Sequence, residues 1–109
     1  MPSYSKGDVV LVRYPFSDLS GSKVRPAIVV NAPHVSQDLF VMPLTSKTDR
    51  LRTGEFILSG WKNSGLNVSS AVKRGLVTIH ESLIVKSVGT LSTSDSERVN
   101  DSLRSWLGI

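Results

Sequence analysis

The chain has 109 residues, a formal net charge of +4 and no cysteine, which fits one domain over residues 1–109 and excludes disulfides, thiolate metal sites and a cysteine nucleophile. No apolar run is long enough for a signal region or a membrane span, so we expect a cytoplasmic protein. The excess of lysine and arginine favours a polyanion or an acidic protein as the partner.

The first expected strand is Asp8–Tyr14, whose almost continuous apolar run predicts burial on both faces. The second is Pro26–Ala32, and a polar loop rich in serine separates the two. Arg25 closes this loop, and the proline after it biases its backbone toward an extended shape. Two strands joined in this way would hold a cation on a rigid platform, where functional residues often lie.

Short runs rich in apolar and β-branched residues continue the pattern after residue 38. Pro43 marks an edge or a bulge, because proline cannot donate to the hydrogen-bond ladder. The segment 46–54 is expected to be a charged loop, and 59–69, with its glycines and asparagines, to be irregular. The further expected strands are Leu39–Thr45, Glu55–Leu58, Ser70–Lys73, Leu76–His80 and Ile84–Leu91.

The period of the apolar residues changes near the C-terminus, where those from Val99 to Leu107 recur at the spacing of an amphipathic helix. Ser94 with Glu97 three residues later predicts a capping box, and Gly108 is expected to end the helix. Many short strands followed by one helix predict a mainly β fold, a small antiparallel barrel or half-barrel with a C-terminal helix.

Short motifs stand in a fixed order along the chain: Gly7–Val12, Pro15–Leu19, Arg25–Val30, Pro43–Ser46, Trp61–Leu66, Val77–Ile79, Val88–Ser92 and Leu107–Ile109. In this order they resemble the MazF/PemK family of toxins from type II toxin–antitoxin pairs. The resemblance implies an SH3-like antiparallel barrel with one C-terminal helix, a fold shared with the CcdB toxins. It also implies a homodimer, an antitoxin with a disordered acidic tail, and growth arrest through blocked translation.

Arg25 is the strongest candidate for chemistry, because a guanidinium stays protonated and offers a fork of donors that matches phosphate oxygens. From the residues alone, an ordinary surface arginine at the start of a strand remains open. Thr45 has a hydroxyl able to donate to phosphate, but a strand-terminal threonine is also common. The resemblance implies that Arg25 is the catalytic arginine and that Thr45 assists it, with Ser46 beside them.

The reaction implied by the resemblance is sequence-specific cleavage of single-stranded RNA, mRNA included, without metal or cofactor. The ribose 2′-hydroxyl would attack its own phosphate and leave a 2′,3′-cyclic phosphate and a 5′-hydroxyl, so DNA would be spared. The general base stays open. Asp18 is the only carboxylate of the 17–24 loop, and His34 and His80 are the only histidines, too few for a zinc site.

The RNA path is expected to follow basic and polar residues close to Arg25 and Thr45. Basic side chains that track a backbone give salt-dependent affinity rather than sequence choice. Trp61 is expected to pack onto the barrel. For Phe16, two roles are equally open: stacking on a base of the RNA, or packing within the protein. The expected RNA-binding residues are Phe16, Ser17, Asp18, Lys23, Ser46, Lys47, Arg50 and Arg52, and none is expected to bind a metal.

Two other functions remain open. CcdB-like gyrase poisons end in Trp-Gly-Ile, whereas this chain has Leu107 inserted between Trp106 and Gly108, and Trp106 fits the apolar stripe of the helix. A non-catalytic SH3-like binding module is the third possibility, since such barrels host many functions. The chain has few aromatic residues to line a groove for proline-rich peptides.

Overall fold

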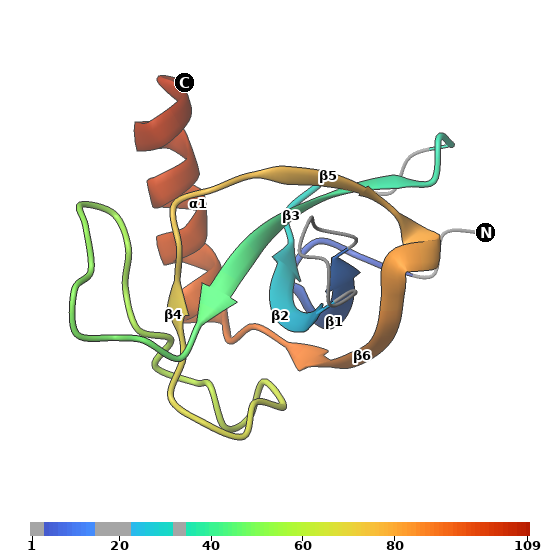
Figure 1. Cartoon of the computed structure of the whole chain (residues 1–109). Coiled ribbons are helices and arrows are strands. Elements are labelled where there is room, and N and C mark those ends of the chain that lie inside the picture. The colour runs from blue at the N-terminus through green and yellow to red at the C-terminus, as the bar shows by residue number, and fades with distance from the viewer. Residues whose placement is uncertain (1–3, 15–22, 32–34) are drawn as a thin grey trace.

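Six antiparallel strands form one curved sheet, and a C-terminal helix packs against it (Figure 1). The structure, a computed structural model, describes residues 4–14, 23–31 and 35–109. The sheet runs in the order β4-β3-β2-β1-β6, and β5 also pairs with β3. The elements are β1 (Asp8–Tyr14), β2 (Lys23–Val29), β3 (Asp38–Thr45), β4 (Ala71–Val72), β5 (Val77–His80), a 3-10 turn η1 (Glu81–Leu83), β6 (Ile84–Thr90) and α1 (Thr93–Leu107).

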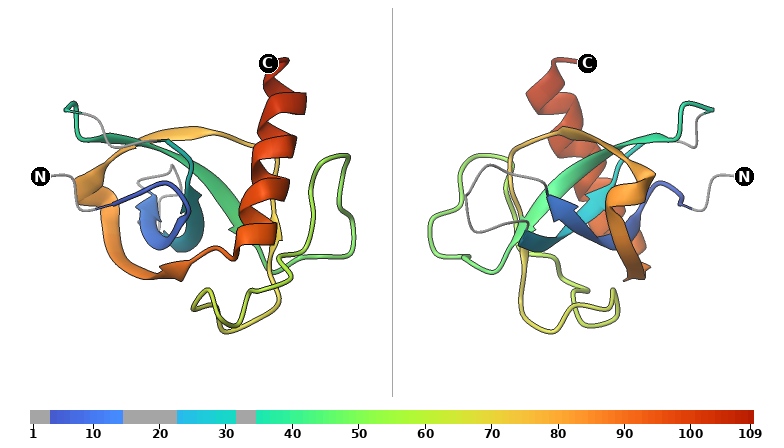
Figure 2. Two further views of the ribbon diagram at one scale, coloured as in Figure 1. Left: turned by 180° about the vertical axis from the view of Figure 1, so that it is seen from behind. Right: turned by 45° about the vertical axis from the view of Figure 1, so that its right-hand side comes forward.

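The predicted mainly β fold with one helix at its end is confirmed. The sheet curls as a barrel does (Figure 1), but within the described residues no ladder joins β6 to β4 or β5, so the barrel is open. Figure 2 shows α1 standing across one side of the sheet, with the 46–58 segment beside the helix and the 59–70 loop beyond the strand ends. No helix of the described residues is long and apolar enough to span a membrane.

The central strand β1 faces two hydrophobic cores. It pairs with β2 on one side and with β6 on the other. Since successive side chains of a strand point to opposite faces, Val9 packs in the core under α1, whereas Val10 and Val12 pack in a second core within the curl. The predicted burial of both faces is confirmed for the valines and Tyr14, whereas Asp8 and Leu11 are half buried and Arg13 is exposed.

The N-cap of α1 lies two residues before the predicted one. Ser92 is the N-cap, and its Oγ accepts a hydrogen bond from the backbone N–H of Asp95 at 3.2 Å. The predicted capping role of Ser94 is therefore wrong. Ser92 caps the helix instead, by bonding to the residue three positions later, as an N-cap serine does. Gly108 ends the helix in the left-handed conformation, as predicted.

Most strands lie within one residue of the predicted bounds, but two differ more. The strand β2 starts at Lys23 and ends at Val29, so Arg25 lies inside a strand and not before one. The expected strand Glu55–Leu58 is reduced to a single bridge between Ile57 and Ala71. On the side of β3 that faces away from β2, pairing with β5 ends at Val41 and pairing with β4 begins at Leu44. Pro43 lies between these two ladders, so its missing N–H interrupts neither of them.

Candidate functional site

A cleft of about 790 Å³ lies where the ends of several strands meet the 59–70 loop. The strands β1, β2, β3 and β6 contribute to its lining, and so do the residues just after β3 and β4. Strand ends presented by a packed sheet hold side chains in fixed positions, which is the usual setting of a binding site. The lining residues are Leu11, Arg25, Pro26, Leu44, Thr45, Ser46, Lys47, Gly65, Leu66, Asn67, Val68, Ser70, Lys73, Lys86 and Val88.

The charge of this cleft is of one sign. Four cationic side chains line it, those of Arg25, Lys47, Lys73 and Lys86, and no carboxylate among the described residues does. All four residues are exposed at the surface. Four like charges around one depression raise the local concentration of anions and favour a polyanionic ligand over a neutral one.

Arg25 reaches this cleft from the middle of the sheet. Its backbone pairs with Val12 of β1, and Ala27, two residues later, pairs with Pro43 of β3. Within the described part of the chain, the Arg25 guanidinium makes no hydrogen bond or ion pair. Its donor fork is therefore available for the oxygens of a phosphate or carboxylate.

Thr45 is the last residue of β3 and pairs with Ala71 of β4. Its Oγ1 accepts a hydrogen bond from the backbone N–H of Lys47 at 3.1 Å. Since that bond uses a lone pair, the hydroxyl proton remains able to donate to an anion in the cleft. The structure thus brings Arg25, Thr45, Ser46 and Lys47 to one surface depression, although it assigns none of them a role.

Two further cations of the cleft, Lys73 and Lys86, were not singled out from the sequence. The backbone N–H of Lys73 donates to the carbonyl of Pro43 at 3.0 Å, which places it next to the end of β3. Lys86 lies on β6, opposite Leu11 of β1. Both lysines lie within or at the end of predicted strands, so only the strand pairing, which the sequence did not reveal, brings them to Arg25.

A buried carboxylate lies beneath Lys73. The Glu55 side chain is only 2% exposed, and its Oε2 lies 3.9 Å from the Lys73 Nζ. It accepts hydrogen bonds from the backbone N–H groups of Arg52 at 2.8 Å and Arg74 at 2.7 Å. Burial raises the pKa of Glu55, but these amide donors and the charges of Lys73 and Arg52 outweigh it and hold the pKa below the ordinary value.

Other predicted RNA-binding residues lie elsewhere. Lys23 is exposed at the start of β2 but does not line the cleft. Arg50 and Arg52 belong to the loop that runs beside α1, and they do not line it either. Their part in RNA binding stays a prediction. Phe16, Ser17 and Asp18 lie outside the described residues.

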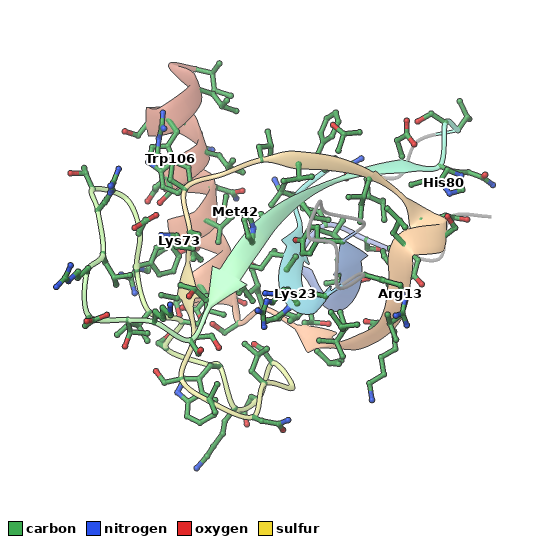
Figure 3. All side chains as sticks on the ribbon, viewed as in Figure 1. Arg13, Lys23, Met42, Lys73, His80 and Trp106 are labelled. Carbon is green, nitrogen blue, oxygen red and sulfur yellow. The ribbon has the colours of Figure 1, made fainter. Side chains whose placement is uncertain are left out.

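No histidine of the described residues lines the cleft. His80 lies at the end of β5, on the other side of the molecule from Lys73 in Figure 3, and its Nδ1 lies 2.9 Å from the Ser82 Oγ. His34 lies outside the described residues. Among those described, no three histidine or carboxylate side chains are grouped closely enough to hold a metal ion. Trp61 packs against the core under α1, as predicted.

The fold and the cleft define a small, mainly β domain whose surface depression is lined by four cations. The model of the PemK-like, MazF-like toxins of type II toxin–antitoxin systems matches residues 5–107, and the chain belongs to this family. The resemblance seen in the sequence motifs is therefore confirmed. No curated protein matches the chain significantly.

Solved structures share its fold at low sequence identity. A MazE–MazF complex from Deinococcus radiodurans is 20% identical, with a TM-score of 0.78 and 97% coverage of each chain. An endoribonuclease in complex with its cognate antitoxin, from a mycobacterial species, is 18% identical, with a TM-score of 0.74, and the match covers 98% of this chain and 97% of that one. The Mycobacterium tuberculosis toxin MazF-mt6 is 19% identical, with a TM-score of 0.74 and coverages of 94% and 97%.

Proposed function

We propose that the protein is an endoribonuclease toxin that cleaves single-stranded RNA, mRNA included, in the cationic cleft and so blocks translation and growth. One observation carries the proposal: Arg25 and Thr45, far apart in sequence, line the same depression, whose charges are all positive among the described residues. RNA is the polyanion that this site fits. Family membership and the endoribonuclease named among the similar structures support the same activity.

The proposed reaction uses a nucleophile of the substrate. The ribose 2′-oxygen bonds to the adjacent phosphorus, the bond from phosphorus to the 5′-oxygen breaks, and a 2′,3′-cyclic phosphate and a 5′-hydroxyl result. The 2′-hydroxyl loses its proton and the 5′-oxygen gains one. The Arg25 fork and the Thr45 hydroxyl would donate to the non-bridging oxygens, where negative charge builds in the transition state.

The proton acceptor stays open, because none of the cleft residues that the structure describes is a histidine or a carboxylate. An arginine side chain is by its solution chemistry a poor proton acceptor. Asp18, which was predicted to bind RNA, lies outside the described residues and is not assigned this role. DNA has no 2′-hydroxyl and should not be cut.

The cognate antitoxin is proposed to compete for the same cations. A disordered acidic tail that folds on binding would be complementary to the four positive charges of the cleft. We further propose a homodimer in the cytoplasm, as the resemblance to the family implies. Size-exclusion chromatography with light scattering would test the dimer, and a monomer at all concentrations would reject it.

The gyrase-poison alternative has less structural support. Trp106 is half buried, and its Nε1 donates to the carbonyl of Thr53 at 3.2 Å. The indole therefore fastens a loop to α1 (Figure 3) and is not a free terminal group. Leu107 and Ile109 are exposed but carry no chemistry of their own.

The test is incubation of a long single-stranded RNA with the purified protein in the presence of EDTA. Wild-type protein should cut it, and Arg25→Ala should lose activity by about 100-fold or more, as when a transition-state donor is removed. Lys62→Ala is the matched control, because Lys62 is an exposed cation that lies over the Trp61 ring and does not line the cleft. Intact RNA with wild type, or equal cleavage by Arg25→Ala, would reject the proposal.

A further inference from the structure

The lining of the cleft is divided by charge. The strands and the residues that follow β3 and β4 supply all four cations, whereas residues 65–70 contribute only uncharged groups. A single strand of RNA presents phosphates on one side and bases on the other. If its phosphates follow the cations, its bases face the uncharged segment, which then becomes the surface where sequence is read.

This uncharged segment is held rigidly against β6. Gly65 has a φ of +91°, and a Cβ there would collide with the backbone oxygen of Val88. A Cβ at Gly89 would likewise collide with the carbonyl oxygen of Ser64. The two backbones therefore lie in direct contact at two glycines, and no side chain separates them.

The start of the same loop is fastened to the helix. Asp95 of α1 is fully buried, and its carboxylate accepts hydrogen bonds from the backbone N–H groups of Ser59 and Gly60, each at 3.0 Å. Within the loop, the N–H of Leu66 donates to the carbonyl of Trp61 at 3.1 Å, and both side chains pack on the core under α1. A reading surface must be fixed in this way, because a mobile one would accept any base.

Among the residues of this segment that line the cleft, only one side chain has a hydrogen-bond donor to spare. The hydroxyl of Ser70 donates to the carbonyl of Val68 at 3.0 Å and is buried. Leu66 and Val68 are apolar. Asn67 is exposed in the cleft, and its carboxamide makes no hydrogen bond with any described residue. A free carboxamide carries a donor beside an acceptor, the pattern that matches the edge of a base.

We propose that Asn67 is a specificity-determining residue, which binds one base next to the cleaved phosphate while the exposed Val68 contacts the face of a neighbouring base. The inference rests on the proposed function and deepens it, since it assigns sequence choice to the 65–70 segment. Arg25, Lys47, Lys73 and Lys86 would then bind RNA of any sequence, and Asn67 would favour adenine, whose N6 amine and N7 acceptor match the two groups of a carboxamide.

The experiment maps cleavage sites on a long RNA for the wild type, Asn67→Ala and Asn63→Ala. Asn63 is the matched control, an exposed asparagine of the same loop that does not line the cleft. Asn67→Ala should lose discrimination at one nucleotide position by about 5- to 150-fold, while its preferences elsewhere and the pattern of Asn63→Ala stay as in the wild type. Asn67→Asp should shift that same position toward bases with an exocyclic amine, because a carboxylate only accepts.

Unchanged base preferences in Asn67→Ala would overturn this inference and leave the proposed nuclease standing. A wild type that cuts RNA without preference at any position would overturn it as well. A wild type that leaves RNA intact would instead reject the proposed function, and the inference with it. Because Asn67 is exposed and makes no hydrogen bond with described residues, its variants should unfold at the wild-type temperature, which excludes misfolding as a cause.

Discussion

Removal of Lys73 or Lys86 should weaken RNA binding and reduce the dependence of the affinity on salt concentration. For single strands, log K falls with log salt by about 0.7 per phosphate neutralised, so the four cations of the cleft predict a slope of about −2.8 if each meets one phosphate. Lys73→Ala or Lys86→Ala should each reduce the slope to about −2.1. Between about 50 and 200 mM salt, affinity should then fall about 50-fold for the wild type and about 20-fold for each variant.

The assay is fluorescence anisotropy with a 2′-O-methyl oligonucleotide, which keeps the phosphates but has no 2′-hydroxyl to attack. The double variant should reach a slope of about −1.4, since the two lysines meet different phosphates. Lys62→Ala removes one positive charge outside the cleft and should keep the wild-type slope. Wild-type slopes for both Lys73→Ala and Lys86→Ala would show that RNA does not follow this cleft.

Three further outcomes concern stability, each followed by urea denaturation. Asp95→Asn should lose about 1.5–3 kcal/mol at neutral pH, because a buried carboxylate that accepts several hydrogen bonds loses its charge. Burial raises the pKa of Asp95, but those hydrogen bonds outweigh it and hold the pKa below the ordinary value. This stabilisation is therefore present at neutral pH and disappears as the pH falls below about 4. A difference in unfolding free energy between wild type and Asp95→Asn that persists at lower pH would contradict the reasoning. Gly65→Ala should cost more than Gly108→Ala, since both glycines have positive φ but only Gly65 faces a backbone oxygen where the Cβ would lie; equal losses would argue against the contact. Trp106→Phe should lose about 1 kcal/mol with the hydrogen bond to Thr53, and no loss would show that water replaces it.

The mainly β fold was predictable because its signals are local. Valine-rich runs, a proline and a change of apolar period are read within a few residues of one another. Arg25 and Thr45 were proposed from the resemblance, and the structure places both in one cleft. Their roles are still to be measured.

The remaining cleft residues depend on tertiary contacts. Arg50 and Arg52 were predicted because their loop was expected to adjoin the strand ends that bear Arg25 and Thr45. The loop that bears them instead turns toward α1, where Ser102 donates to the carbonyl of Gly54 at 2.7 Å. Lys73 and Lys86 lie far from Arg25 in sequence and reach the cleft through strand pairing. Pairing partners are set by long-range packing, for which a single sequence gives no local signal.

The position of α1 at the end of the chain has a consequence for synthesis. The helix closes one hydrophobic core with Val99, and it fastens two separate loops, one through Asp95 and one through Trp106. A ribosome makes these residues after every strand, and domains complete their folding only when their last elements emerge. A nascent chain that has not yet reached α1 would therefore lack the two anchors that hold the loops around the cleft, so these surroundings would form only after the helix is made.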